Sequence, residues 1–367
     1  MNNILIWALK WMLAVCLQLR YPTVRFQKEE PVRSDPSYEI YETYRYAYRQ
    51  YGYLFSYAEE TQEDDKTANE TTGWEKEAGN GENEKENGGS GNVKETYSLE
   101  RDAGNERNST LFSRLQDYDY LMKHYFSVHA STTADRGLMK ADQLLGTDVT
   151  LEKNPEVPQI LIYHTHASET YADYGPGQPD ATVVGAGTYL TELLRAKGWN
   201  VIHDTTAYDQ KEGKLERSRA YTYALEGIQR ILQEHPTIEV ILDLHRDGVA
   251  ESVRLVQEIQ GKPTAQIMFF QGMSRTPEGE IAYLPNPYLQ ENLAFSFQMQ
   301  LALSRYPGFT RKIYLKGLRY NLHLRGRSSL IEAGAQTNTM EEARNAMELL
   351  AQAVDTVLQP AGGDAVN

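Results

Sequence analysis

The chain of 367 residues contains a single cysteine, Cys16, so no disulfide can form within it. The folded part must therefore be stabilised by an ordinary hydrophobic core. The absence of thiolates beyond residue 16 also disfavours a structural zinc site or an iron–sulfur cluster.

A basic patch is missing as well. The formal net charge is −14, and it is unevenly distributed along the chain. The stretch from Glu59 to Glu95 carries 12 acidic side chains against four lysines, a net of 4 − 12 = −8. A surface that binds phosphates needs clustered lysine and arginine, so the charge pattern argues against nucleic acid as a partner.

The sequence has no hydrophobic run of the usual transmembrane length. The most apolar segment, Ile4 to Leu19, has 16 residues, whereas a helix needs roughly 20 to cross a bilayer. No small-x-small cleavage site follows it. We interpret residues 1–20 as an uncleaved membrane anchor, because the segment after it cannot form a core to bury it. A buried or interfacial helix is the alternative, and the basic residues that follow leave the orientation open.

Residues 21–108 offer little that could form a core. The first part is polar and rich in tyrosine, and the run from Asn80 to Gly91 consists of Asn, Gly, Glu, Lys and Ser. Burial of so few apolar side chains cannot offset the entropy of ordering the chain. We expect a tyrosine-rich segment followed by a disordered acidic linker that tethers the rest of the protein.

Apolar periodicity resumes after residue 108. Residues 109–157 predict an N-terminal helical extension, with helices near 113–125 and 140–146. From residue 158, strand and helix signals alternate: strands are expected at 159–165, 199–203, 238–244, 265–270 and 328–331, and helices at 184–197, 215–234, 288–306 and 340–358. This alternation predicts an α/β domain over 158–358, with a mainly parallel, twisted sheet covered by helices on both faces. Residues 359–367 are expected to be a disordered tail.

Three of the predicted strands become polar where they end: HTHASE at 164–169, DLHRD at 243–247 and IEAG at 331–334. Ligands bind beyond the carboxyl ends of the strands in such sheets. One buried histidine or glutamate is usually satisfied by backbone partners. Three polar strand ends at one edge of a sheet are harder to explain in that way, so we interpret them as one functional site.

The residues at these ends have the composition of a catalytic zinc site, which uses three histidine or carboxylate ligands and leaves one position open. His166 and Glu169 form a close pair, and His245 adds a third ligand from 245 − 166 = 79 positions later. Glu332 is then available as the general base.

The sequence resembles the stage II sporulation protein P family. The resemblance rests on LIYHTHASETY (161–171), DLHRDG (243–248) and LIEAGAQTNTMEEA (330–343), and it extends from about residue 118 to 354. It implies a membrane-anchored peptidoglycan hydrolase of spore-forming bacteria, similar in fold to zinc-dependent N-acetylmuramoyl-L-alanine amidases. It also implies a role in engulfment during sporulation, in the space between mother-cell and forespore membranes. Cleavage of stem-peptide cross-links would be a second activity, and other sporulation cell-wall hydrolases and membrane anchors of the D and M type would be its partners.

The resemblance also implies roles for individual residues. It selects His166 over His164 as the first zinc ligand, His245 as the third, and Glu332 as the catalytic residue. Related amidases take the second ligand from the first turn of a helix, but here that turn has no acid, so Glu169 is assigned instead. His164 is left as a second-shell partner or an alternative ligand. The remaining motif positions either hold the substrate, orient the ligands or are structural: Arg246, Asp247, Arg319, Asn321 and Asn338.

Two other functions are compatible with the sequence. One is a scaffold that binds peptidoglycan without cutting it, although such a protein would have no need to keep Glu332. The other is a zinc hydrolase of small amides or peptides, which the anchor and the linker disfavour.

Overall fold

The computed structural model describes residues 113–360. The predicted anchor, tyrosine-rich segment and linker lie outside the described residues, as does most of the predicted tail. Within the described part, no helix is both long and apolar enough to cross a membrane.

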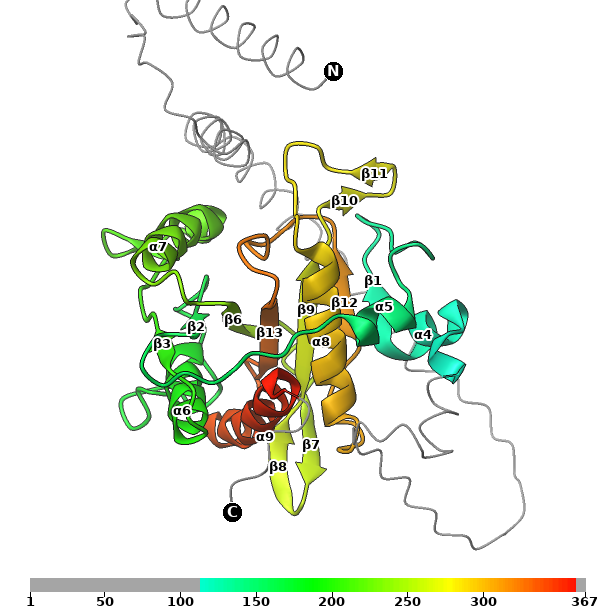
Figure 1. Cartoon of the computed structure of the whole chain (residues 1–367). Helices are drawn as coiled ribbons and strands as arrows, with labels where there is room; N and C mark the ends of the chain where they lie inside the picture. The colour runs from blue at the N-terminus through cyan, green and yellow to red at the C-terminus, as the bar shows by residue number, and fades with distance from the viewer. Residues whose placement is uncertain (1–112, 361–367) are drawn as a thin grey trace, which may run out of the picture. The chain divides into compact units, whose positions relative to one another are not determined.

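A seven-stranded sheet forms the centre of the described part (Figure 1). Its order is β1 (Phe126–Val128), β12 (Ile313–Lys316), β9 (Ile267–Gly272), β13 (Ser328–Ala335), β6 (Val240–Asp247), β2 (Ile160–Tyr163) and β3 (Val201–His203). Neighbouring strands are parallel except for β13 and β9, which are antiparallel. The sheet therefore consists of two parallel blocks that run in opposite directions, and the prediction of a mainly parallel sheet is confirmed.

Three long helices cover one face of the sheet: α6 (Val183–Ala196), α8 (Leu289–Leu303) and α9 (Met340–Leu358). In Figure 1, α8 and α9 lie in front of the strands. Their apolar side chains join one core with alternate strand residues such as Phe269 and Ile331. The covering on this face is thick enough to bury every residue of α8 from Asn292 to Leu303.

The opposite face carries a smaller core. Leu161, Tyr163 and Ile241 pack there against Ala224 and Ile228 of α7 (Ala220–Glu234). Helices thus lie on both faces, as predicted, but on this face α7 covers only the β2–β6 side. Over β9 and β12, the apolar cluster of the described part is built from strands and from the loop around Leu322, and none of the described helices contributes a residue to it.

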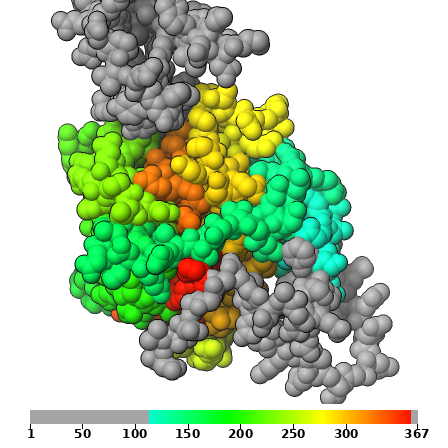
Figure 2. Space-filling model, in the orientation of Figure 1, coloured from blue at the N-terminus to red at the C-terminus, as the bar shows by residue number. Residues whose placement is uncertain are grey.

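The N-terminal extension is part of the same body. Its helices are α4 (Tyr118–Tyr125) and α5 (Ala141–Gly146), but it also supplies β1, for which the sequence analysis predicted no strand. Gln298 of α8 donates hydrogen bonds to the carbonyls of Leu144 and Thr147. Figure 2 shows the segment that follows α5 crossing the surface between α8 and α9.

Several boundaries differ from the prediction. The helix expected from residue 215 begins at Ala220, because the preceding residues form β5 (Lys214–Leu215) and a short 3-10 helix, Arg217–Arg219. β6 and β13 each continue further than expected and carry the polar residues at their ends within the strand. The smaller hairpins pair β4 (Gln210–Lys211) with β5, β7 (Val256–Ile259) with β8 (Lys262–Ala265), and β10 (Arg275–Thr276) with β11 (Gly279–Glu280).

Candidate metal centre

The three polar strand ends meet at one edge of the sheet. β2, β6 and β13 are adjacent and parallel, so their carboxyl ends lie together. Glu332 lies directly opposite His245 in the register of β13 and β6. Side chains at opposite positions of neighbouring strands point to the same face, so both project from the face that α7 partly covers.

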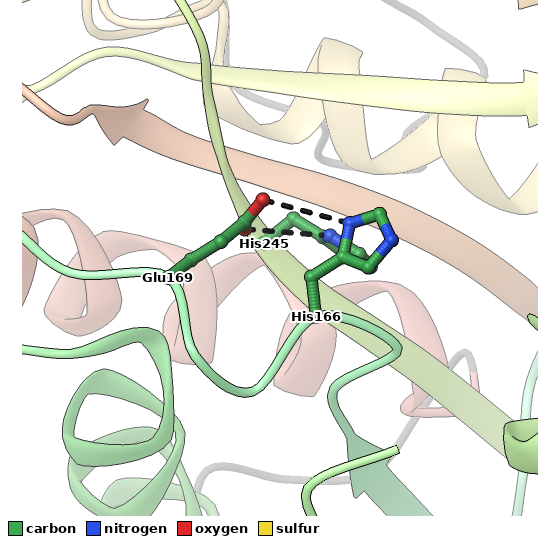
Figure 3. Close-up of side chains that lie close together, drawn as sticks. All are labelled: His166, Glu169 and His245. Atoms are coloured by element: carbon green, nitrogen blue, oxygen red, sulfur yellow. Dashed lines mark ion pairs between the residues drawn. The ribbon is translucent and has the colours of Figure 1, made fainter. Parts of the chain in front are cut away.

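His166, Glu169 and His245 form a compact cluster in which one ligand atom from each lies within 4.8 Å of the others. His166 and Glu169 come from the turn after β2, and His245 reaches them from β6 (Figure 3). Nδ1 of His166 lies 3.6 Å from one oxygen of Glu169, and Nδ1 of His245 lies 3.5 Å from the other. The structure therefore brings together the three residues that the sequence analysis selected as ligands.

The donor set fits a zinc ion. The two nitrogen–oxygen separations exceed those of ordinary hydrogen bonds. They match instead the separation of about 3.4 Å between two ligands of a tetrahedral ion with bonds of about 2.1 Å. Nε2 of His166 is buried and has no hydrogen-bond partner in the described residues, so no hydrogen bond of this nitrogen there competes with binding of a metal. Two imidazoles and a carboxylate are the ligand types of catalytic zinc sites.

Glu169 is held in position by two arginines. The guanidinium of Arg217 donates to one carboxylate oxygen at 2.9 Å, and the backbone N–H of Arg246 donates to the other at 3.1 Å. Burial would raise the pKa of Glu169, but the neighbouring His166 and His245 hold it well below its usual value. The carboxylate is therefore ionised and oriented, as a metal ligand must be.

Asp243 supports both the turn and the second histidine. Its oxygens accept hydrogen bonds from the backbone and hydroxyl of Thr165 at 2.9 and 2.7 Å. One of them also lies 2.8 Å from Nε2 of His245. A carboxylate behind a ligating histidine fixes its ring and increases its basicity. Burial would lower the pKa of His245, but Asp243 and then Glu169 raise it well above its ordinary value.

Glu332 stands next to this cluster and outside it. Its Oε2 is buried and has no hydrogen-bond partner in the described part of the chain. Burial, together with the negative charge of Asp247, raises the pKa of Glu332 to about 8. In the metal-free protein this side chain is thus a weak acid poised near neutrality, which is the property expected of a general acid–base group.

A bulge in β13 follows Glu332 immediately. The register with β6 shifts between Glu332 and Ala335, and Gly334 between them has a φ of 67°. A Cβ on Gly334 would lie 2.8 Å from Oδ1 of Asn338. Bulges bend a strand and redirect its side chains, so glycine at this position allows β13 to turn away just beyond the catalytic candidate.

His164 does not belong to the metal cluster. Its Nδ1 is 2.8 Å from the carbonyl of Leu244 and its Nε2 is 2.8 Å from Nε2 of His203. Burial and the nearby His203 lower the pKa of His164 to about 4, so the ring is neutral. Because the carbonyl can only accept, Nδ1 carries the proton and Nε2 accepts one from His203. Both ring nitrogens are engaged, which argues for the supporting role and against the alternative of a metal ligand.

The other predicted site residues have varied positions. Arg246 and Asp247 lie beside the cluster, and Asp247 forms an ion pair with Arg311. Asn338 instead bonds to Ala335, to the carbonyl of Leu255 and to Glu342, so it secures the loop before α9. Arg319 is buried, and Asn321 donates from Nδ2 to the carbonyl of Tyr221 at 2.8 Å. Neither lies in the metal cluster.

Several residues that shape the centre were not predicted from the sequence. Asp243 was part of a recognised strand end, but it was given no role; its spacing of two from His245 on one strand was the available signal. Arg217 and His203 lie far from the ligands in the chain, so their spacing in the sequence carried no signal of a role beside them. Asp209 belongs to the same group, since its carboxylate accepts from the backbone of Ser168 at 3.1 Å and holds the turn between the two ligands.

A match to a protein-family model shows the family to which this chain belongs. Residues 36–355 match the family model described as Stage II sporulation protein P. The chain belongs to this family. A search of curated proteins finds no match.

Solved structures that are similar to this chain include amidases. The CwlD amidase from Clostridioides difficile, solved in complex with the GerS lipoprotein, is 17% identical; the match covers 54% of this chain and 95% of that one, with a TM-score of 0.34. The N-acetylmuramoyl-L-alanine amidase AmiC2 of Nostoc punctiforme is 12% identical, with 56% and 97% covered and a TM-score of 0.32.

Proposed function

We propose that this protein is a zinc-dependent hydrolase that cleaves the amide bond between N-acetylmuramic acid and L-alanine in peptidoglycan. The observation that carries the proposal is the cluster of His166, Glu169 and His245 beside Glu332 in a member of the stage II sporulation protein P family. A binding scaffold would not require a carboxyl group with its pKa raised towards neutrality beside a set of metal ligands.

Each residue has a defined task in this reaction. His166, Glu169 and His245 would hold the ion, with Asp243 and Arg217 fixing two of these ligands. The bound zinc supplies Lewis acidity to the attacking water and to the scissile carbonyl. Glu332 takes a proton from the water and delivers it to the departing nitrogen. Its Oε2, which has no hydrogen-bond partner among the described residues, is available for both transfers.

The setting of the enzyme forms part of the proposal. We place it in the cell membrane through residues 1–20, as a single-pass protein with its catalytic domain outside, between mother-cell and forespore membranes. Peptidoglycan is its substrate, with stem-peptide cross-links as a second target. Other sporulation hydrolases and membrane anchors of the D and M type are the expected partners.

Digestion of defined muropeptides tests the activity. The full-length protein in detergent, loaded with zinc, should release free stem peptides from disaccharide peptides, and mass spectrometry should identify L-alanine as their new N-terminal residue. Products cut only within the peptide would make the protein an endopeptidase instead. No products at all from a zinc-loaded protein would favour the scaffold.

Substitution of Glu332 by glutamine separates catalysis from metal binding. The amide keeps the shape of the side chain but cannot accept the proton. Turnover should fall by at least about a hundredfold, while zinc content stays at one per chain. Glu348→Gln on α9, where the carboxylate accepts hydrogen bonds from Lys262 and Tyr189 away from the metal centre, is the matched control and should act like the wild type. Loss of zinc in Glu332→Gln would instead make Glu332 a ligand or its support.

A further inference from the structure

A row of aromatic side chains leads away from the metal centre. The ring of His166 lies against Tyr221, with centroids 5.7 Å apart, and Tyr221 lies 5.3 Å from Tyr320. Tyr320 is 4.7 Å from Phe270, and Phe270 is 5.6 Å from Tyr314. We refer to Tyr221, Tyr320, Phe270 and Tyr314 as the aromatic row; it is continuous and begins at a ligand of the candidate metal centre.

The row lies on the same face of the sheet as Glu332. Phe270 is opposite Leu330 in the register of β9 and β13, and Tyr314 is opposite Phe270 in the register of β12 and β9. Leu330 precedes Glu332 by two positions and so shares its face. With strands about 4.8 Å apart and a rise of about 3.3 Å per residue, Tyr314 lies roughly 12 Å from Glu332.

Among the described residues, no helix contributes to the apolar cluster on this face beyond β13. The small cluster there consists of Phe270, Leu322 and Leu330, with Tyr314 and Tyr320 packed on it and only partly buried. Tyr221 is likewise partly exposed. The rings therefore present part of their surface at the protein exterior, next to the catalytic candidate.

A strained loop holds the row together. Tyr320 and Asn321 have φ values of 48° and 56°, a left-handed conformation that non-glycine residues adopt at a cost. The side chain of Asn321 donates to the backbone carbonyl of Tyr221 at 2.8 Å. This bond joins the loop to the start of α7 and keeps Tyr320 beside Tyr221. Asn321 is a motif position outside the metal cluster, and its role is to position Tyr320 beside Tyr221.

We propose that the aromatic row is the surface on which the glycan strand of peptidoglycan lies during cleavage. The proposal rests on the proposed function, since the amide bond in question joins a sugar to a peptide and both must lie next to the metal centre. Pyranose rings present C–H faces that pack on aromatic rings, and tyrosine adds a hydroxyl for the polar edge of the sugar. Tyrosine and phenylalanine carry no charge near neutral pH. An uncharged surface suits the N-acetylated sugars of a glycan strand better than it suits stem peptides, which carry carboxylates.

Peptide-free glycan strands test the proposal without relying on catalysis. The full-length protein in detergent should bind them, as measured by co-sedimentation, and Tyr314→Ala should weaken binding about tenfold, the loss expected for about 1.4 kcal/mol of ring contact. Tyr314→Phe keeps the ring and loses only the hydroxyl contact, so it should weaken binding much less than Tyr314→Ala. Tyr189→Ala, which removes a partly buried tyrosine from α6 on the other face, is the matched control.

Kinetics give an independent measure. Tyr314→Ala should raise KM for long glycan strands with attached peptides more than it lowers kcat, and it should affect cleavage of a single disaccharide peptide less, because that substrate has fewer sugars to lie along the row. A thermal melt verifies folding, and Tyr320→Ala serves as a second variant if Tyr314→Ala is unstable.

The outcomes separate the two proposals. Failure of the wild-type protein to bind peptide-free glycan, or unchanged binding by both variants, overturns the role of the row. Binding of free stem peptides that weakens in Tyr314→Ala assigns the row to the peptide and also overturns it. If the protein binds glycan through the row but cuts no muropeptide, the proposed activity fails and the binding surface stands. If the protein cuts muropeptides but does not bind glycan, the proposed activity stands and the role of the aromatic row fails.

Discussion

Asp243 connects two segments that form the metal centre. It accepts a hydrogen bond from Thr165 at the beginning of the turn that carries His166 and Glu169, and it lies 2.8 Å from Nε2 of His245. Burial would raise its pKa, but the charge of His245 and the hydrogen bonds from Thr165 keep it below its ordinary value. The side chain therefore stays ionised near neutral pH, although it is fully buried.

Asp243→Asn should weaken zinc binding by about 10- to 100-fold, as is usual when the partner of a ligating histidine loses its charge. Competition with a chelator of known affinity measures the change. Asp355→Asn is a suitable control, because Asp355 binds Lys153 and Trp199 and no residue of the metal centre. Unchanged zinc affinity in Asp243→Asn would mean that Asp243 serves the fold only.

The ionisable groups of the centre also predict how stability depends on pH. In the metal-free protein the pKa of His245 is raised. Its protonated ring therefore stabilises the folded state below pH 6.5, and this stabilisation is lost as the pH rises through the pKa of the folded state. Glu332, with a pKa of about 8 instead of 4.5, binds a proton in the folded state that the unfolded chain releases. Both effects lower the stability of the metal-free protein as the pH rises.

The melting temperature of the chelated protein should therefore fall between pH 6.5 and 9, whereas zinc, which binds deprotonated ligands, should stabilise more strongly over the same range. Thermal unfolding with and without chelator measures the widening difference. This window lies above the range in which His164 and His203, with pKa values of about 4, take up protons. Chelated Glu332→Gln should show a smaller decline, and a decline equal to that of the wild type would contradict the role assigned to Glu332.

Among the elements, β13 has the most demanding geometry. It pairs in parallel with β6 and antiparallel with β9, and it bends at Gly334 just after Glu332. The left-handed φ of Gly334 would cost another residue about 1–2 kcal/mol. An added Cβ would also lie 3.0 Å from Cβ of Ala265.

Gly334→Ala should therefore lower the free energy of unfolding by at least about 1–2 kcal/mol, and it should reduce turnover more than zinc content because the bend positions Glu332. Denaturant titration and metal analysis measure the two effects. Gly175→Ala is the control, since no atom lies within 4 Å of the added Cβ and its φ is not left-handed. Normal turnover in Gly334→Ala would show that the bulge does not position the carboxylate.

The sequence predicted the elements that have a strong hydrophobic period and missed those without one. The four main helices and the strands around His166, His245 and Glu332 were expected, because long apolar runs end there in polar residues. β1 (FSV) and β12 (IYLK) are short and contain polar residues, whereas β2 is as short as β12 but is the uninterrupted apolar run ILIY. The reversal of β9 relative to β13 depends on the path of the connecting chain, and local sequence does not encode it.

The same distinction applies to the site. His166, Glu169, His245 and Glu332 stand in motifs at strand ends, so their meeting followed from the parallel arrangement of the strands. The aromatic row was not predicted because its members come from α7, a loop and two strands. Only the order of the strands in the sheet brings Phe270 and Tyr314 together.

For the molecule as a whole, the extension before residue 158 is part of the folded body. β1 lengthens the sheet at β12, and α5 lies on α8, whose residues from Asn292 to Leu303 are buried on every side. The domain limits predicted from the sequence, 158–358, would remove this covering. Exposed apolar surface of that kind leads to aggregation or loss of the helix.

A chain that begins at residue 158 should therefore be insoluble or melt well below one that begins at residue 109, with the exposed outer face of α8 as the physical cause. Solubility and calorimetry of the two chains measure the difference. Deletion of residues 59–107 from the full-length protein is the matched control: that stretch has too few apolar residues to bury, so its loss should leave both melting temperature and zinc content unchanged. Equal stability of the chains that begin at 109 and 158 would show that the extension is dispensable. A large drop in melting temperature after the 59–107 deletion would refute the interpretation of those residues as a linker.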